Sequence, residues 1–183
     1  MHTIICGTTL TGKTTLGRIL AREAKKRKIM SMVFDRRDSG YCCDIVVKSF
    51  NRFLELAQAS SNMMLFVDDC PTVLKRGEDS HKWLTTESRH QGHNVVLMAQ
   101  RYMMIPKDNR DNCDTVWMFR QSLSDCQEIA DDFGYDWHDI RPGRKPMEKL
   151  HFLKINSDGI RSGSVDPVSG NVFINVGSQR HDE

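Results

Sequence analysis

The chain carries the stretch Gly7-Thr8-Thr9-Leu10-Thr11-Gly12-Lys13-Thr14, which fits the pattern G-x-x-x-x-G-K-[ST]. An apolar run, residues 3–6, comes before it, and a segment of helical character, residues 14–21, comes after it. A strand, a glycine-bearing loop and a helix in that order are the setting in which this pattern binds phosphate groups. The stretch therefore predicts a phosphate-binding loop that joins a strand to a helix.

The residue types in this loop suit a nucleoside triphosphate. Two glycines let the backbone wrap closely around the phosphates and direct several N–H groups at their oxygens. The Lys13 ammonium reaches the β- and γ-phosphates, the Thr14 hydroxyl ligates Mg²⁺, and the N-terminus of the following helix adds positive potential. The alternative is a glycine turn that binds nothing. We expect ATP and Mg²⁺ as cofactors, with the nucleotide contacted by Gly7, Thr8, Thr9, Leu10, Thr11, Gly12, Lys13, Thr14 and Thr15.

Length and composition fit one globular domain. The chain has 183 residues, of which 39% are hydrophobic and 27% are charged, enough for one buried core. The sequence has no apolar run long enough to predict a membrane span. The first strand begins so near the N-terminus that it leaves no room for a secretory signal. The six cysteines lack a paired metal-binding spacing, which favours reduced thiols over a disulfide or zinc framework. The net charge of +2 does not by itself indicate a nucleic-acid-binding protein.

Strand-like and helix-like segments alternate through the first two thirds of the chain. Strands are expected at residues 2–6, 29–35, 63–67, 94–99 and 115–119, and helices at 14–28, 45–59, 80–90 and 124–133. Several strand segments are apolar without alternation, which is typical of parallel strands buried on both faces. The sequence therefore predicts an α/β fold of the P-loop NTPase (RecA/ASCE-like) type, a three-layer sandwich around a mostly parallel sheet with a short C-terminal β-rich extension.

The end of the chain differs in composition from the rest. Arginines and lysines cluster at residues 141–149, and short β-like runs follow at 151–155 and 171–176. These runs suit an added hairpin or edge strands. We therefore expect a P-loop ATPase core over residues 1–140 and a basic connection with a β-like extension over 141–183, in the same domain or as a small appendage.

A pair of carboxylates, Asp68 and Asp69, follows the apolar run at residues 63–67. A buried strand that ends in acids has the form of a Walker B motif. Asp68, at the strand end, is placed to hold Mg²⁺, and Asp69 is placed to polarise a water molecule for attack on the γ-phosphate. The alternative is a helix cap or a turn.

Gln100 follows the apolar strand at residues 94–99. In the predicted parallel sheet this strand lies between the phosphate-loop strand and the Walker B strand, so its carboxyl end faces the γ-phosphate. A neutral amide at that point can orient the attacking water and sense the loss of the phosphate. The alternative is a surface glutamine at the start of a loop.

The segment at residues 89–101 resembles the arginine-to-glutamine segment of the FtsK–HerA superfamily of DNA-pumping ATPases. The residues that end the Walker B motif, Asp68-Asp69-Cys70, and the short chain length are most similar to the viral branch of this superfamily, the poxvirus-type and phage genome-packaging ATPases. The similarity covers residues 3–135 as ordered motifs. After the first segment, the matching features are, in order, Pro106, Arg110 and residues 112–119.

The resemblance implies a role for each matching residue. Lys13 and Thr14 serve phosphate and Mg²⁺, Asp68 serves Mg²⁺, Asp69 activates water and Gln100 acts as the sensor. Many relatives carry Glu at the position of Asp69, and a shorter carboxylate requires the water to lie closer.

These motors complete each active site with an arginine from the neighbouring subunit, which neutralises charge in the transition state. Arg89 is the first choice for this catalytic role, because its segment leads into the sensor strand and is expected to face outward. Arg101, Arg110 and Arg120 are the alternatives.

The resemblance also implies partners. The expected assembly is a homo-oligomeric ring around DNA, bound through its backbone and therefore salt-sensitive. Double-stranded DNA is the expected substrate, and single-stranded DNA is the alternative that the sequence leaves open. Basic loops at residues 36–37, 75–76 and 107–110 are the expected DNA contacts. A capsid portal or vertex protein is a further expected partner, and the host-cell cytoplasm or the virion is the expected location.

Three other functions share the phosphate loop. A filamentous-phage-type export ATPase usually carries a membrane segment, which this sequence does not predict. A small nucleoside or nucleotide kinase needs an arginine-rich lid, and none is evident. A non-catalytic P-loop switch has no need for both Asp69 and Gln100.

Overall fold

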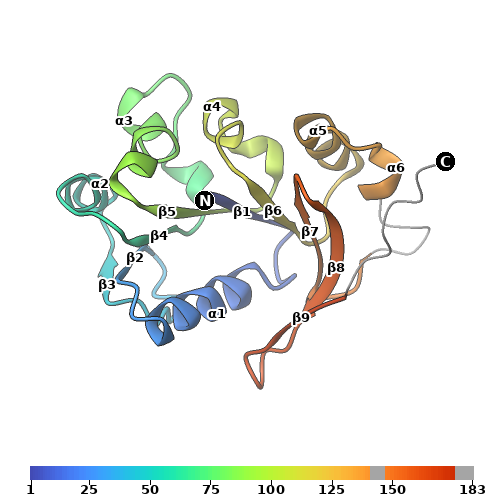
Figure 1. Ribbon diagram of the computed structural model, residues 1–183, viewed down its shortest axis with the longest axis horizontal. Helices are drawn as coiled ribbons and strands as arrows, with labels where there is room; N and C mark the ends of the chain where they lie inside the picture. The colour runs from blue at the N-terminus through green and yellow to red at the C-terminus, as the bar shows by residue number, and fades with distance from the viewer. Residues whose placement is uncertain (141–146, 176–183) are drawn as a thin grey trace.

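A single sheet organises the computed structural model, which describes residues 1–140 and 147–175. Within these ranges the strand order is β3-β2-β4-β5-β1-β6-β7-β8-β9 (Figure 1). The strands are β1 (Thr3–Cys6), β2 (Ser31–Phe34), β3 (Ile45–Val47), β4 (Met64–Val67), β5 (Asn94–Ala99), β6 (Thr115–Met118), β7 (His151–Asn156), β8 (Gly159–Val165) and β9 (Val172–Ile174).

The first six strands are parallel to one another, and the last three are antiparallel additions at one edge. β5 lies between β1 and β4, with Val96 beside both Thr3 and Phe66. This confirms the predicted position of the strand that ends at Gln100. Because the parallel strands run in one direction, the segments after β1, β4 and β5 meet at the carboxyl edge of the sheet.

Helices cover both faces of the sheet, as the predicted three-layer sandwich requires. The helix α1 (Lys13–Lys26) lies on one face, and the other α-helices lie on the opposite face (Figure 1). These are α2 (Phe50–Gln58), α3 (Asp79–Lys82), α4 (Lys107–Arg110), α5 (Leu123–Phe133) and α6 (Trp137–Ile140), with 3₁₀ turns η1 (Cys70–Thr72), η2 (Glu87–Gln91) and η3 (Tyr102–Met104).

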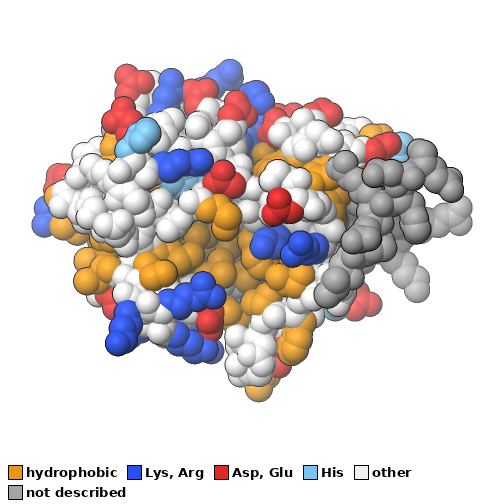
Figure 2. Space-filling model, in the orientation of Figure 1, with side chains coloured by type: hydrophobic (Ala, Val, Ile, Leu, Met, Phe, Trp, Pro, Cys, Tyr) orange, Lys and Arg blue, Asp and Glu red, His pale blue; other side chains and the backbone are white. Residues whose placement is uncertain are grey.

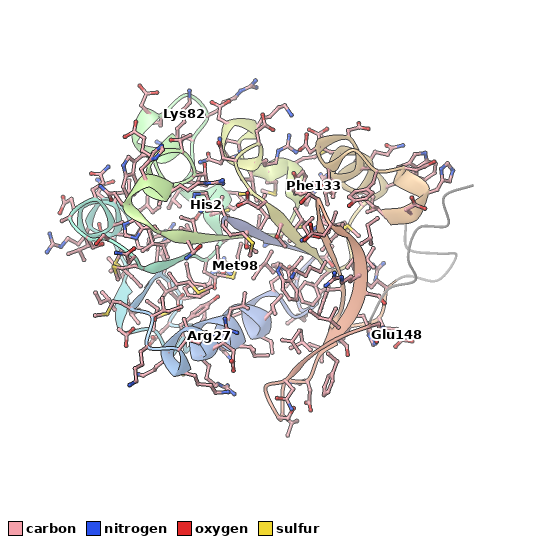
Figure 3. All side chains as sticks on the ribbon, viewed as in Figure 1. His2, Arg27, Lys82, Met98, Phe133 and Glu148 are labelled. Carbon is pink, nitrogen blue, oxygen red and sulfur yellow. The ribbon has the colours of Figure 1, made fainter. Side chains whose placement is uncertain are left out.

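Two apolar layers hold the sandwich together. Successive strand side chains point to opposite faces, so Ile4 belongs to the layer under α2 and α5 while Ile5 packs in the layer with Leu16 of α1. Met98 lies in that second layer, between the sheet and α1 (Figure 3). Both layers contain strand residues with no solvent exposure, which is why the strand sequences are apolar without alternation.

Two predicted helices are wrong in part. Residues 45–47 of the helix expected at 45–59 form β3, because this β-branched run pairs with β2. Helix α2 begins only after Ser49, whose hydroxyl accepts a hydrogen bond from the backbone N–H of Arg52. The helix expected at 80–90 is divided into α3 and η2. The Thr86 hydroxyl between them bonds back to the Lys82 carbonyl, a pattern that weakens a regular helix.

The C-terminal segment continues the main sheet. β7 pairs antiparallel with β6, and β8, which the sequence analysis missed, lies between β7 and β9. The backbone N–H of Leu150 donates a 3.0 Å hydrogen bond to the carbonyl of Thr11, so the segment also touches the phosphate loop. Three residues of the expected basic connection, Arg141, Arg144 and Lys145, lie outside the described residues.

All six cysteines have free thiols, and four of them are buried. None of the helices within the described ranges is long and apolar enough to cross a bilayer. Lys and Arg side chains gather over the C-terminal end of α1 (Figure 2), where Lys25 and Lys26 occupy the last helical turn. Cations suit this end of a helix, and it is the end farthest from the phosphate loop.

Candidate nucleotide-binding site

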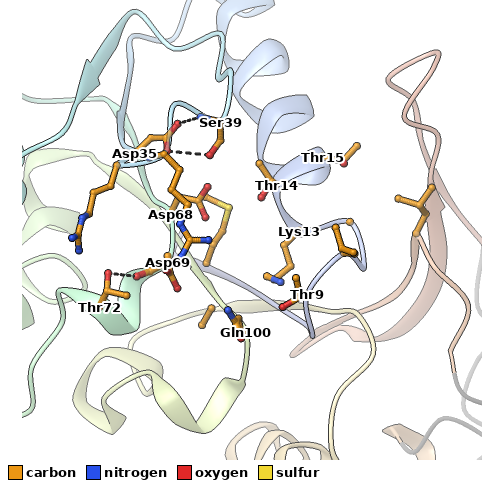
Figure 4. A pocket seen from close by; sticks show the side chains of 17 residues that line it. Thr9, Lys13, Thr14, Thr15, Asp35, Ser39, Asp68, Asp69, Thr72 and Gln100 are labelled. Carbon is orange, nitrogen blue, oxygen red and sulfur yellow. Dashed lines mark hydrogen bonds and ion pairs between the residues drawn. The ribbon is translucent and has the colours of Figure 1, made fainter.

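A cavity of about 730 Å³ lies at the carboxyl edge of the sheet. The loop before α1 and the ends of β2, β4 and β5 line it, so Lys13 and Thr14 face Asp68 and Asp69 across the space (Figure 4). The predicted site residues that line this cavity are Thr9, Leu10, Gly12, Lys13, Thr14, Thr15, Asp68, Asp69 and Gln100.

The loop backbone depends on both glycines of the motif. A Cβ added to Gly7 would lie 2.5 Å from the Cβ of Phe119. Gly12 has φ +120°, and a Cβ there would lie 2.9 Å from the Phe119 ring. The backbone N–H of Gly7 donates to the carbonyl of Ala99, the last residue of β5, at 3.2 Å, and that of Thr8 donates to the carbonyl of Arg120, after β6, at 3.0 Å. The loop is therefore held by the sheet behind it, and no other residue type fits at these two positions.

Lys13 is bound by its own loop in this structure. Its Nζ donates to the carbonyl oxygens of Gly7 at 2.6 Å and Thr8 at 2.9 Å. Burial lowers the pKa of Lys13, and the nearby Asp68 opposes that shift. A charged phosphate is a stronger hydrogen-bond acceptor for a cation than a neutral carbonyl is. We therefore expect the Lys13 ammonium to exchange these two carbonyls for the oxygens of a bound triphosphate.

Asp68 is a partly buried carboxylate at the end of β4. Burial raises its pKa, while a hydrogen bond from Tyr41 opposes the shift. The Tyr41 hydroxyl donates to Oδ2 of Asp68 at 3.1 Å, and burial followed by the charge of Asp68 raises the pKa of Tyr41 far above its usual value. Tyr41 therefore stays protonated as a fixed donor. The sequence analysis missed Tyr41, whose place depends on the loop after β2 lying beside β4.

Asp69 has a left-handed backbone, with φ 54° and ψ 45°, and it precedes η1. Its carbonyl accepts hydrogen bonds from the backbone N–H and the hydroxyl of Thr72, at 3.0 and 2.8 Å (Figure 4). Its carboxylate pairs with Arg37 at 3.1 Å. Asp69 is therefore held at the cavity from both its backbone and its side chain.

The residues present fit Mg²⁺ bound together with a nucleotide. The partly buried carboxylate of Asp68, which accepts a hydrogen bond from Tyr41, lies across the cavity from the Thr14 hydroxyl, and Mg²⁺ prefers such oxygen ligands. No cluster of three His, Cys, Asp or Glu residues that could hold a metal occurs in the part of the chain that the structure describes. That is compatible with an ion that takes most of its ligands from phosphates and water.

Gln100 follows β5 directly and lines the cavity. Its carbonyl accepts a 3.1 Å hydrogen bond from the side chain of Gln121, which fixes the backbone and leaves the Gln100 side chain exposed to the cavity (Figure 4). The next residue, Arg101, pairs with the buried carboxylate of Asp125 at 2.9 Å. The end of β5 is therefore connected to α5 through adjacent residues.

Arg89 lies away from these residues. It belongs to η2, which precedes β5 and so stands at the amino edge of the sheet, opposite the cavity. Its guanidinium bonds the carbonyl of Asn112 at 2.7 Å and the carboxylate of Asp114 at 3.2 Å, and the side chain is 45% exposed. Arg89 therefore takes no part in the cavity of its own chain.

The other candidate arginines differ in burial. Arg110 is buried, pairs with Glu128 and stacks over the Tyr102 ring at 4.7 Å, so it serves the fold. Arg120 is exposed and follows β6, at the same edge as the phosphate loop. Among the expected DNA contacts, Lys107 is paired with Asp111 and Asp132. The basic character expected for residues 107–110 is thus neutralised within the chain.

The loop after β2 supplies cavity residues that were not expected at the nucleotide site, and two of them, Arg36 and Arg37, were expected to contact DNA instead. Asp35, Arg36, Arg37 and Ser39 line the cavity. The sequence pattern that pointed to Asp68, an apolar strand followed by an acidic residue, also occurs at Asp35. Leu150 also lines the cavity, and no local pattern connects it with the phosphate loop.

No protein-family model and no curated protein sequence matches the chain. Solved structures do. The genome packaging NTPase B204 from Sulfolobus turreted icosahedral virus 2, in complex with AMPPCP, aligns with TM-score 0.69 and 17% identity over 96% of this chain and 97% of that one. B204, the DNA-packaging ATPase from Sulfolobus turreted icosahedral virus, aligns with TM-score 0.68 and 15% identity over 97% and 98%.

A third similar structure is the pCW3 conjugation coupling protein TcpA, with TM-score 0.61 and 12% identity over 88% of this chain and 58% of that one. At these identities the likeness concerns the fold, and it confirms the predicted P-loop NTPase architecture. The chain therefore has, over nearly its whole length, the fold of the genome packaging NTPase B204.

Proposed function

We propose that this chain is an ATP-driven DNA translocase, the packaging motor ATPase of a virus. The observation that carries the proposal is that Lys13, the two carboxylates after β4 and Gln100 after β5 all line the same cavity. That set of groups serves hydrolysis by water. The likeness to two packaging NTPases over the full chain supports the choice of substrate and process.

Binding begins with the triphosphate in the phosphate loop. The backbone N–H groups of the loop and the Lys13 ammonium surround the β- and γ-phosphates. Thr14 and Asp68 would hold Mg²⁺, which would neutralise phosphate charge. The Tyr41 hydrogen bond keeps the Asp68 carboxylate oriented toward that position.

Hydrolysis needs a water molecule in line with the γ-phosphate. The Gln100 amide orients this water, and the Asp69 carboxylate accepts its proton as the water oxygen bonds to phosphorus. The bond from phosphorus to the β–γ bridging oxygen breaks, which leaves ADP and phosphate. Because Asp69 is shorter than the Glu of many relatives, the water must lie close to the end of β4.

Movement follows from the loss of the γ-phosphate. Gln100 loses a hydrogen-bonding partner, and its neighbour Arg101 is bonded to Asp125 of α5, so the change at the end of β5 reaches the helical layer. The chains work as a homo-oligomeric ring around double-stranded DNA, with Arg89 supplied to the neighbour's site. A portal or vertex protein of the capsid is the docking partner, in the host cytoplasm or at the virion.

Exposed basic residues remain available for the DNA backbone. Lys75 and Arg76 are exposed on the segment that follows η1, near the carboxyl edge. Contacts of this type are independent of DNA sequence and weaken as salt rises. We therefore assign the DNA contact to residues 75–76 rather than to residues 107–110.

The test is ATP turnover measured with and without double-stranded DNA. We expect DNA to raise turnover in wild type, and we expect Lys13→Ala and Asp69→Asn to lower it by a hundredfold or more, on the order seen when charge-stabilising groups are removed. Arg52→Ala is the control, since Arg52 is an exposed helix residue outside the cavity, paired with Glu55. Phosphate transfer to a nucleoside with no effect of DNA would instead identify a kinase and overturn the proposal.

A further inference from the structure

The loop after β2 holds the backbone of Arg37, one of the two arginines with which it lines the cavity. The Asp35 carboxylate, which is buried, accepts hydrogen bonds from the backbone N–H groups of Arg37 and Ser39 and from the Ser39 hydroxyl. The bonds between Asp35 and Ser39 are visible in Figure 4. Asp38, between them, has φ +61°. This tight turn presents the Arg37 guanidinium to the cavity that the loop lines.

Arg37 meets the proposed water-activating carboxylate there. Its Nη2 lies 3.1 Å from Oδ2 of Asp69. Asp69 itself is held by its left-handed backbone and by the bonds from Thr72. The two charged side chains therefore meet from two separately anchored turns, one after β2 and one after β4.

The ion pair between Arg37 and Asp69 is weak, although the backbone of each residue is held in place. The Arg37 side chain is 75% exposed and that of Asp69 is 29% exposed, and exposed pairs contribute at most about 1 kcal/mol. A stronger anion can therefore displace the carboxylate. A terminal phosphate is such an anion, because it carries more charge and presents several oxygens to a planar guanidinium.

Arg37 and Lys13 are both cations at this cavity that are bound by acceptors from their own chain. Lys13 is bound by the carbonyls of Gly7 and Thr8, and Arg37 is bound by Asp69. Each cation has an acceptor from its own chain that a phosphate oxygen can replace. Lys13 stands on the loop before α1, where it reaches the β- and γ-phosphates, whereas Arg37 stands beside the Walker B strand.

We propose that Arg37 is a triphosphate-sensing residue that exchanges partners: it pairs with Asp69 when no triphosphate is bound and with the terminal phosphate when one is bound. The inference rests on the nucleotide binding in the proposed function and adds regulation to it. The exchange frees the Asp69 carboxylate to accept a proton from water only when a phosphate is present to be attacked. A diphosphate does not reach Arg37, so the pair with Asp69 then persists.

Binding measurements test the exchange without relying on DNA or turnover. The affinities of ADP and of the non-hydrolysable analogue AMPPCP are measured by calorimetry for wild type, Arg37→Ala, Arg37→Lys and Asp69→Asn, and for the double variant that combines Arg37→Ala with Asp69→Asn. Arg52→Ala is the matched control, because Arg52 is also an exposed arginine paired with a carboxylate. Circular dichroism of each variant verifies the fold.

The exchange predicts a selective pattern. Arg37→Ala weakens AMPPCP about tenfold, as the loss of a charge-assisted bond does, and leaves ADP within about twofold; Arg37→Lys keeps part of the selectivity. Asp69→Asn tightens AMPPCP about threefold by freeing Arg37, and this gain disappears when Arg37 is absent.

Two results would overturn the inference. One is an equal loss of ADP and AMPPCP affinity in Arg37→Ala. The other is a gain from Asp69→Asn that persists without Arg37, since that gain would come from simple charge repulsion. A wild-type chain that binds AMPPCP but shows no DNA-stimulated turnover would count against the proposed translocase alone, and the Arg37 pattern would still be decided by the affinities.

Discussion

The two walls of the cavity are built on different principles. The loop wall, residues 7–15, is shaped by its backbone, and the absence of side chains at Gly7 and Gly12 determines its form. The acid wall, formed by Asp68, Asp69 and Gln100, is shaped by side-chain partners from elsewhere in the chain, Tyr41 and Arg37 among them.

This difference affects how each wall tolerates change. A backbone-built wall fails when any side chain enters it, whereas a partner-built wall adjusts in steps as single bonds are lost. The loop wall therefore fixes where the phosphates lie, and the acid wall can respond to which phosphates are present.

The largest effect is expected from Arg89, which belongs to neither wall. It lies at the amino edge of the sheet, so it can reach a cavity only if neighbouring subunits stack the amino edge of one against the carboxyl edge of the next, a head-to-tail contact that closes into a ring. We expect Arg89→Ala to lower DNA-stimulated turnover by about a thousandfold, as for arginines that act in trans.

Mixing identifies the mode of action. Arg89→Ala subunits keep Lys13, and Lys13→Ala subunits keep Arg89, so a mixed ring contains some complete sites. Turnover of the mixture should exceed that of either variant alone, while Arg52→Ala, the exposed-arginine control, should behave as wild type. Absence of rescue at every mixing ratio would reject Arg89 and direct attention to Arg120, which is exposed and follows β6 at the carboxyl edge of the sheet.

A methyl group at Gly12 should break the loop wall outright. Alanine there meets a φ of +120° and two side chains, Phe119 at 2.9 Å and Leu150 at 3.0 Å. We expect Gly12→Ala to weaken nucleotide binding by about a hundredfold and to lower the free energy of unfolding by about 3 kcal/mol. Calorimetry with AMPPCP and urea unfolding measure the two effects.

Gly134→Ala provides the matched control for that substitution. Gly134 also has a positive φ, +69°, but a Cβ there would meet nothing within 4 Å. Its replacement should cost about 1 kcal/mol of stability and leave nucleotide affinity unchanged. Equal losses of affinity in the two variants would mean that the loop wall does not depend on the space at Gly12.

The contrast between the walls also explains what the sequence could predict. The loop wall is local, so residues 7–14 identify it through spacing alone, and the parallel sheet follows from apolar runs without alternation. Asp68, Asp69 and Gln100 were found because each ends an apolar strand. Tyr41 was missed, and Arg37 was expected to contact DNA rather than the nucleotide site, because the roles of both depend on β2 lying beside β4, a pairing between distant segments.

The errors in the secondary structure predicted from the sequence also arise from pairings between separate segments. The β-branched run at residues 45–47 is compatible with a helix until the edge of β2 is available to pair with it. β8 contains Gly159 and Gly163, which disfavour a strand by propensity, yet its pairing with β7 stabilises it. Gly163 is needed there, because a Cβ would lie 2.3 Å from the carbonyl oxygen of Phe173.

The smallest effect is expected from Tyr41→Phe, which removes one bond from the acid wall. The ring of Tyr41 is buried and keeps its packing, while Asp68 loses the 3.1 Å hydrogen bond that opposes the rise in its pKa. We expect a loss of about 1 kcal/mol in the free energy of unfolding near neutral pH and an AMPPCP affinity in the presence of Mg²⁺ lowered by about fivefold.

The pH dependence gives this prediction its sign. Burial raises the pKa of Asp68 above its ordinary value, so over the range between the two the folded protein holds a proton that the unfolded chain has released, and stability falls as pH rises through that range. Tyr41→Phe raises the folded pKa further and extends the range upward, so the variant should lose more stability relative to wild type as pH rises. In an Asp68→Asn background the cost of Tyr41→Phe should not vary with pH over this range, because the titrating carboxylate is absent. A pH-dependent cost that survives Asp68→Asn would show that Tyr41 acts on another group, and the acid wall would then depend on the loop after β2 through Arg37 alone.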